Sequence, residues 1–377
     1  MRLEAPIPTR AMIAIRAPFL DAGAELLDAP TVQPLGQLLD LAGEVLRERL
    51  FVLQSDGGEE ACLRPDFTIP AVRAHVTSGR PSGRYFYEGH AFRVAPALAH
   101  RAEEFLQIGL EAFEPGDPCG KDAEIAALAW RSAAAGGRDD LRIVFGDVGL
   151  FSSFIESLGL PAALRARLER AFSSRRRLRA ELSAGATTAA AKAADRLAAL
   201  LGDISESEAA AALEEIWRLS GIDAVGGRSA VEIVHRLRER SAIASAPHLT
   251  PAQAELIGRF LAIADRPEAA LRAIAELGGP EAERLERELE AWRRRLDVLV
   301  ALGVPPQALT LSSAFVRAFG YYDGFLFEIR SAALGEDEPV AAGGRYDGLP
   351  FRLGASCATG AVGCMVRPSR AWAGAGR

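Results

Sequence analysis

Apolar and polar positions follow different periods in different parts of this 377-residue chain. Before residue 161 and again after residue 304, short runs rich in aromatic and branched residues predict β-strands. Between 161 and 304, apolar residues recur every three or four positions among Ala, Leu, Glu and Arg, which predicts amphipathic helices. The predicted strands lie at 61–64, 84–89, 103–114, 141–148, 320–331, 339–350 and 358–366.

The order of these segments indicates one sheet domain whose sequence is interrupted. Residues 1–160 and 305–377 would supply the two parts of a mixed sheet, and 161–304 would form a helical insertion between them. Within the first part, 68–76 is expected to be a helix with Thr68 as its cap. The fold class that follows is α+β.

The predicted strand at 103–114 has two different faces. Period two places Phe105, Gln107, Gly109 and Glu111 on one face and aliphatic residues on the other, which should pack on helices. A glycine in mid-strand often marks close approach by a ligand or by another backbone. The alternative is an ordinary half-exposed strand with its polar side toward water.

Three further segments combine polar side chains with turn residues. They are LRPDFT at 63–68, FGYYDGFLFE at 319–328 and GGRYDG at 343–348. Each also has a purely structural interpretation: a helix cap with a surface ion pair, aromatic residues of the core, and a tight loop held by an Arg–Asp pair. The occurrence of all three with the polar strand, in this order, is a stronger signal than any one of them.

Composition excludes some function classes and weakens others. The net charge of −6 argues against nucleic acid as the main partner, and the basic run at 173–179 is interpreted as a solvated helix face. The four cysteines form no CxxC pair and the five histidines show no ligand spacing, so we expect no metal site. No apolar run is long enough to span a membrane, and we expect a cytoplasmic protein.

The ordered set of segments resembles the catalytic domain of class II aminoacyl-tRNA synthetases, and histidyl-tRNA synthetase in particular. LRPDFT is similar to the LRPE-x-T segment of that family, and AFRVAPALAHRAEEFLQIGLE at 91–111 resembles its motif 2. VRAFGYYDGFLFE at 316–328 and AAGGRYDGL at 341–349 resemble the two histidine-specific signatures. The resemblance implies an antiparallel sheet flanked by helices, with a helical insertion.

The resemblance also implies a binding pocket for L-histidine. Asp66, Thr68 and Gln107 would face the ammonium group of the ligand, and Arg93 and Arg317 would lie near its carboxylate. The family carries Glu where this chain has Asp66, which is one methylene shorter. The full set of histidine-binding residues that the resemblance implies is Asp66, Thr68, Arg93, Gln107, Glu111, Arg317, Tyr321, Tyr322 and Tyr346.

The imidazole ring of the ligand would lie among Glu111, Tyr322 and Tyr346. Together these side chains offer anions to an ammonium group, cations to a carboxylate and polar aromatic groups to an imidazole. The segment GGRYDG would therefore line an amino-acid pocket rather than hold a phosphate. We expect no catalytic residue, no metal and no cofactor.

Several positions depart from the synthetase pattern. Ala95 stands where motif 2 has an acidic residue, and His100 stands where its loop has a glycine. Arg367 replaces a glycine of motif 3 and Pro368 follows it, which alters the surface that holds adenine in that family. The sequence stops soon after Arg370, so we expect no anticodon-binding domain.

A synthetase-like core with a retained amino-acid pocket resembles the regulatory subunits of the short-form ATP phosphoribosyltransferase of histidine biosynthesis. That resemblance implies a non-catalytic subunit that activates the short catalytic subunit and mediates feedback inhibition by histidine. It also implies a homodimer within a hetero-octamer, without nucleic acid or membrane partners. Two alternatives stay open: a truncated synthetase-like enzyme that adenylates histidine, and an RNA-binding module.

Overall fold

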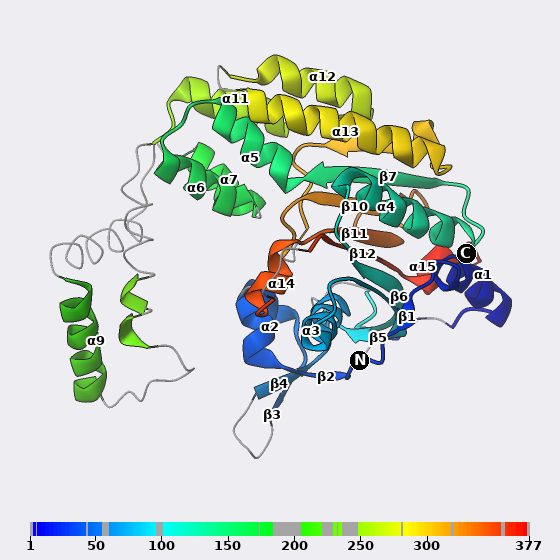
Figure 1. The fold of residues 1–377 in the computed structure, drawn as a ribbon, viewed down its shortest axis with the longest axis horizontal. Coiled ribbons are helices and arrows are strands. Elements are labelled where there is room, and N and C mark those ends of the chain that lie inside the picture. The colour runs from blue at the N-terminus through cyan, green and yellow to red at the C-terminus, as the bar shows by residue number, and fades with distance from the viewer. Residues whose placement is uncertain are drawn as a thin grey trace. The chain divides into compact units, whose positions relative to one another are not determined.

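The structure is a computed structural model, and Figure 1 shows its fold. The described residues are 3–4, 6–42, 44–54, 60–95, 101–172, 174–183, 205–220, 229–231, 233–235, 248–279, 282–317, 320–355 and 359–374. His100, Cys357 and the first residue of the basic run at 173–179 lie outside them.

The chain forms two compact units. The larger contains Met1–Phe154, Phe260–Gly278 and Ala282–Arg377, and the smaller contains Ile155–Arg259 and Gly279–Glu281. The expected helical insertion, 161–304, does not coincide with the smaller unit. The difference arises because α12 (Pro267–Leu277) and α13 (Glu283–Ala301) pack with β9 and α4 of the larger unit. Amphipathic periodicity alone could not show which unit would receive these two helices.

The larger unit is built on a nine-stranded sheet with strand order β1-β5-β6-β12-β11-β10-β7-β9-β8. Neighbouring strands are antiparallel except for the parallel pairs β1–β5 and β7–β9, which confirms the expected α+β class. The strands are β1 (Glu25–Leu26), β5 (Gly83–Phe92), β6 (Glu104–Phe113), β7 (Leu141–Asp147), β8 (Ala264–Asp265), β9 (Leu309–Ser312), β10 (Phe325–Ser331), β11 (Ala341–Arg345) and β12 (Ala361–Val366).

Helices cover both faces of this sheet (Figure 1). On one face α4 packs on β10, β11 and β12, and α1 and α13 both pack against α4. On the other face α3 packs on β6, and Thr68 at its start reaches the polar side of that strand. The remaining elements of the larger unit are α1 (Thr9–Leu20), α2 (Leu35–Ala42), η1 (Glu44–Arg49), α3 (Thr68–Ser78), α4 (Pro118–Ala134), α5 (Val148–Ser157, which continues into the smaller unit), η2 (Pro306–Ala308), α14 (Gly348–Arg352) and α15 (Pro368–Ala371).

A second sheet has three strands in the order β2-β4-β3. These strands are β2 (Val32–Pro34), β4 (Glu60–Leu63) and β3 (Val52–Gln54). In the smaller unit the described helices are α6 (Ala162–Phe172), α7 (Arg175–Leu182), α9 (Glu206–Ser220) and most of α11 (Pro251–Leu261). No described helix is long and apolar enough to cross a membrane.

The structure differs from the expected secondary structure in two details. Thr68 does not cap α3, because its hydroxyl donates to Glu111 and the N-cap position falls on Phe67. The expected strand at 339–350 ends at Arg345, and Gly348–Arg352 forms the short helix α14.

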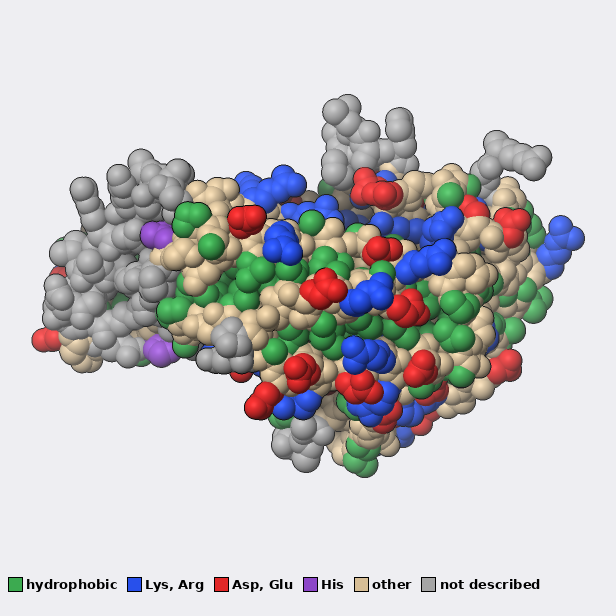
Figure 2. Space-filling model, turned by 90° about the horizontal axis from the view of Figure 1, so that it is seen from above, with side chains coloured by type: hydrophobic (Ala, Val, Ile, Leu, Met, Phe, Trp, Pro, Cys, Tyr) green, Lys and Arg blue, Asp and Glu red, His purple; other side chains and the backbone are tan. Residues whose placement is uncertain are grey.

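The basic run at 173–179 lies largely on α7. On the face of the molecule seen in Figure 2, acidic and basic side chains are interspersed.

Candidate functional site

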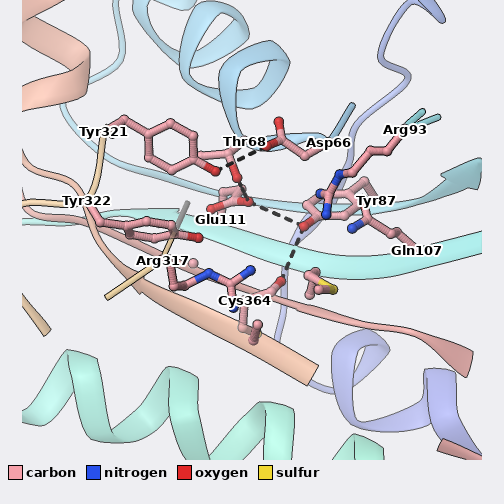
Figure 3. A pocket seen from close by; sticks show the side chains of 13 residues that line it. Asp66, Thr68, Tyr87, Arg93, Gln107, Glu111, Arg317, Tyr321, Tyr322 and Cys364 are labelled. Carbon is pink, nitrogen blue, oxygen red and sulfur yellow. Dashed lines mark hydrogen bonds between the residues drawn. The ribbon is translucent and has the colours of Figure 1, made fainter. Parts of the chain in front are cut away.

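A polar pocket lies on the face of the sheet that carries α3, and Figure 3 shows its side chains. Strands β5, β6, β11 and β12, the start of α3 and the segment before β10 contribute to its walls. The residues that line it are Asp66, Thr68, Tyr87, Arg93, Gln107, Glu111, Arg317, Tyr321, Tyr322, Ala342, Gly363, Cys364 and Met365. The structure thus brings together eight of the nine residues predicted for the site, and Tyr346 reaches it through Glu111.

Glu111 is the centre of the pocket's hydrogen bonds. Its Oε1 accepts from the hydroxyl of Thr68 at 2.9 Å and from that of Tyr87 at 3.3 Å. Its Oε2 accepts from the hydroxyl of Tyr346. Burial is the main cause that raises the pKa of Glu111 to about 8; the nearby Asp66 contributes to the increase, and the three hydrogen bonds oppose it. A carboxyl group in this state holds its proton near neutral pH.

Two glycines allow Glu111 and Tyr87 to occupy these positions. Gly363 is the cross-strand partner of Glu111, and a Cβ there would lie 1.6 Å from Glu111 Oε2. A Cβ on Gly109 would lie 2.3 Å from both the hydroxyl of Tyr87 and the carbonyl oxygen of Cys364. The mid-strand glycine therefore marks a close approach, as the sequence pattern indicated.

Asp66 and the neighbouring tyrosines Tyr321 and Tyr322 form another wall of the pocket. Tyr321 donates to Asp66 Oδ2 at 3.1 Å, and its ring lies 4.6 Å from that of Tyr322. Burial raises the pKa of Asp66, although Arg93 and the bond from Tyr321 act against this increase. Burial also raises the pKa of Tyr322 to about 12 and raises the pKa values of Tyr87, Tyr321 and Tyr346, so these four tyrosine hydroxyls keep their protons at neutral pH.

Two arginines supply the positive charge of the pocket. Arg93 donates from Nε to the carbonyl of Pro65 at 2.8 Å, and burial lowers its pKa to about 10. Arg317 forms an ion pair with Glu328 at 2.9 Å, with 9% of its side chain exposed. Both guanidinium groups stay protonated at neutral pH, so the pocket contains fixed cations as well as carboxyl groups.

The side-chain amide of Gln107 is unusual in this setting. The residue is only 1% exposed, yet neither its nitrogen nor its oxygen has a hydrogen-bond partner among the described residues. The Nε of Arg317 is also buried without a partner among them. Buried polar groups are nearly always hydrogen-bonded, so an amide left open on a pocket wall is suited to bind a polar ligand.

Comparison with known proteins identifies the family. The family model described as Histidyl-tRNA synthetase matches residues 9–242 and 230–369. Proteins named ATP phosphoribosyltransferase regulatory subunit from Brucella canis and Brucella melitensis are 34% identical to this chain. Each match covers 96% of this chain and 96% of the relative. The chain belongs to the histidyl-tRNA synthetase-like family of ATP phosphoribosyltransferase regulatory subunits.

Solved structures agree with this assignment at the level of the fold. One is a Bacillus halodurans protein described as an ATP phosphoribosyltransferase regulatory subunit/histidyl-tRNA synthetase, with a TM-score of 0.61, 19% identity and coverage of 96% of this chain and 77% of that one. A histidine–tRNA ligase subunit from Alicyclobacillus acidocaldarius has a TM-score of 0.58 at 21% identity, with 99% and 98% coverage. The synthetase-like class II fold expected from the sequence is thereby confirmed.

The departures from the synthetase pattern have a structural consequence at Arg367. Its guanidinium lies 3.6 Å from the ring centroid of Phe105 and forms an ion pair with Glu4. Arg93 lies over the same ring at 5.3 Å. The side chain of Arg367, at the position where the resemblance implies a motif 3 glycine, therefore covers the ring of Phe105 on the strand that also carries Gln107 and Glu111.

Some side chains in and near the pocket make contacts that the sequence did not indicate. Tyr87 was within a predicted strand but was not assigned to the site, because a strand aromatic is normally a core residue. Arg64 makes no ion pair with any described residue, and instead donates to the carbonyl groups of Ala29 and His90 at 2.5 and 2.7 Å. The expected pair of Arg345 with Asp347 is present at 2.9 Å.

Proposed function

We propose that this chain binds L-histidine in the Glu111 pocket and acts as the regulatory subunit of a short-form ATP phosphoribosyltransferase. The observation that supports this ligand is the buried amide of Gln107, which has no hydrogen-bond partner in the described part of the chain and lies in one pocket with carboxyl groups and arginines. The names of its relatives, which are ATP phosphoribosyltransferase regulatory subunits, support the partner enzyme. In this role the chain itself catalyses no reaction, activates the catalytic subunit and transmits inhibition by histidine.

The chemistry of the pocket matches a zwitterion with an imidazole side chain. Asp66 and the amide oxygen of Gln107 suit the ammonium group, and Arg317 suits the carboxylate. Glu111, with its pKa raised to about 8, can share a proton with an imidazole whose own pKa is about 6.5. The hydroxyl of Tyr346 holds Glu111 for this contact.

Ligand binding requires the pocket to open. The cavity between the side chains is about 20 Å³, which is room for a single water molecule. Tyr322 is half-buried and its ring lies 5.8 Å from the guanidinium of Arg317. Displacement of these two side chains would admit the ligand, so histidine would select a state of the chain that differs from the one described.

A difference between the histidine-bound state and the state described here would allow the ligand to regulate the complex. Histidine would bind more tightly to a restrained state of the complex than to an active one, with a coupling of ~1–3 kcal/mol. By linkage, the substrates of the catalytic subunit would weaken histidine binding by the same factor. The assembly proposed from the family resemblance is a cytoplasmic hetero-octamer of four regulatory and four catalytic chains, built on regulatory homodimers.

A rate assay tests the proposal directly. The chain is mixed with the short catalytic subunit from the same source, and phosphoribosyl transfer is measured while L-histidine is titrated. Activation on mixing followed by inhibition by histidine supports the proposal, and no effect on the rate refutes it. Histidine-dependent exchange of pyrophosphate with ATP by the chain alone would instead indicate an enzyme that adenylates histidine.

A pair of arginine variants assigns the inhibition to the pocket. Arg317 and Arg330 both pair with Glu328, at 2.9 Å in each case, but only Arg317 lines the pocket. Arg317→Ala is expected to abolish inhibition and to leave activation intact, and Arg330→Ala is expected to retain both. Full sensitivity of the Arg317→Ala complex to histidine would show that the ligand binds elsewhere.

A further inference from the structure

A buried ionic cluster lies on the face of the sheet opposite the pocket. Asp122 on α4 has no exposed surface, and its carboxylate accepts hydrogen bonds from two arginines. Arg295 of α13 donates to its Oδ2 from Nη2 at 2.8 Å and from Nε at 3.0 Å. Arg345 contacts its Oδ1 from Nη2 at 2.7 Å and from Nε at 2.8 Å. Burying such a cluster is costly and gives little net stability, which raises the question of what it positions.

The cluster and the pocket are joined by two consecutive residues. Successive side chains of a strand point to opposite faces of its sheet. At the end of β11, Arg345 points to Asp122 on the face covered by α4, and Tyr346 points to the pocket on the other face, where its hydroxyl donates to Glu111. A displacement of Arg345 on one face therefore moves Tyr346 on the other.

The backbone around Tyr346 is tied down by the same arginine. Arg345 donates from Nη1 to Asp347 Oδ1 at 2.9 Å, and this oxygen also accepts from the backbone N–H of Ala361 at 2.7 Å. The N–H of Tyr346 in turn donates to the carbonyl of Ala361 at 2.8 Å. One guanidinium group thus connects α4, the 345–347 segment and the start of β12.

We propose that Asp122, Arg295 and Arg345 form a positioning cluster that fixes Tyr346 against Glu111 and connects helix α13 to the pocket through the sheet. The geometry needs a planar guanidinium at 345, because its separate N–H groups reach Asp122 and Asp347 at once, and a lysine cannot do this. The inference rests on the proposed function only for the choice of L-histidine as the ligand that reports on the pocket.

The test is a double-mutant cycle on histidine affinity. Arg345→Lys, Tyr346→Phe and the double variant are titrated with L-histidine by calorimetry, and thermal unfolding is recorded for each. Arg138→Lys is the matched control, since Arg138 also donates to several partners, including Ser331 Oγ at 3.1 Å, but does not contact Tyr346 or Asp122. Loss of the bond that Tyr346 makes is expected to weaken binding ~10-fold.

Arg345→Lys should weaken binding about as much as Tyr346→Phe, and the double variant should bind as Tyr346→Phe alone does. Arg138→Lys should leave the affinity unchanged. Wild-type affinity in Arg345→Lys would overturn the proposal, and so would losses that multiply in the double variant, because Arg345 would then not act through Tyr346.

A measurement without ligand separates this inference from the proposed function. The ¹³C titration of the Glu111 carboxyl, assigned with Glu111→Gln, is compared in wild-type, Arg345→Lys and Arg138→Lys proteins. The bond from Tyr346 lowers the pKa of Glu111, so Arg345→Lys should raise that pKa and Arg138→Lys should not. If wild-type protein bound no histidine, the proposed function would fail, and this titration would still decide the role of the cluster: an unchanged Glu111 pKa in Arg345→Lys would overturn it.

Discussion

Replacing Glu111 with glutamine is expected to change how the stability of the protein depends on pH. The folded chain raises the pKa of Glu111 from 4.5, the ordinary value for a glutamic acid, to about 8. A group whose pKa is raised on folding stabilises the folded state most below its unfolded pKa. This contribution is lost as pH rises from about 4.5 through about 8, and glutamine, which does not titrate, shows no such loss.

The size of the effect follows from the same two values. The difference of about 3.5 in pKa corresponds to about 5 kcal/mol between the two ends of the titration. Most of the loss falls below neutral pH, and between pH 5 and pH 7 the wild type should lose ~2 kcal/mol relative to the variant. Glu111 is 1% exposed, so screening by solvent removes little of it.

Urea unfolding of both proteins at a series of pH values measures this difference. Glu114→Gln is the control, because hydrogen bonds from Arg84 are the main cause that lowers the pKa of Glu114 to about 2. Its contribution is present above pH 4.5 and is lost only in acid, so wild type and Glu114→Gln should differ by a constant amount between pH 5 and pH 8. A constant difference for Glu111→Gln over the same range would refute the argument that burial keeps this carboxyl protonated.

Two other substitutions test the packing around the site, and a third tests packing away from it. Gly363→Ala places a methyl group on Glu111 Oε2 and should lower stability by ~1–3 kcal/mol and histidine affinity more than ~10-fold, as measured by unfolding and calorimetry. Tyr87→Phe removes a donor at 3.3 Å from Glu111 and should cost ~1 kcal/mol in urea unfolding. Gly136→Ala puts a Cβ 2.1 Å from the carbonyl oxygen of Ala371 and should lower the free energy of unfolding by ~1–3 kcal/mol. Histidine affinity should stay unchanged in this variant. A loss of affinity would show that packing anywhere in the unit alters the pocket.

The parts of the site that could be predicted are those with local signals. Strand β6 alternates in a way that places Gln107, Gly109 and Glu111 on one face, and the structure has them there. The turn residues around Asp66 and Tyr346 also carry local signals, and both side chains reach the same carboxyl-rich pocket.

The positioning cluster could not be predicted, because its partners are distant in sequence. Asp122 and Arg295 are separated by 173 positions, and Arg295 belongs to a run of three arginines in an amphipathic helix. Such a run is normally solvated, and only the packing of α13 on α4 buries this member of it. The same tertiary contact decides that α13 belongs to the larger unit.

Two buried arginines and the pocket amide differ in how many of their hydrogen bonds are made. Arg367 forms an ion pair with Glu4 and stacks on Phe105, although its Nε has no hydrogen-bond partner among the described residues. Arg370 donates to the carbonyl of Pro339 and to Glu338. In the pocket, by contrast, the amide of Gln107 has no partner among the described residues. An anion at Arg367 and Arg370 would compete with Glu4 and Glu338, just as a ligand carboxylate at Arg317 would compete with Glu328. What distinguishes the pocket is therefore the amide of Gln107, because both of its polar atoms, which have no partner among the described residues, are open to a ligand. Under the proposed function this amide favours binding of an amino acid, which is the property that a histidine sensor requires.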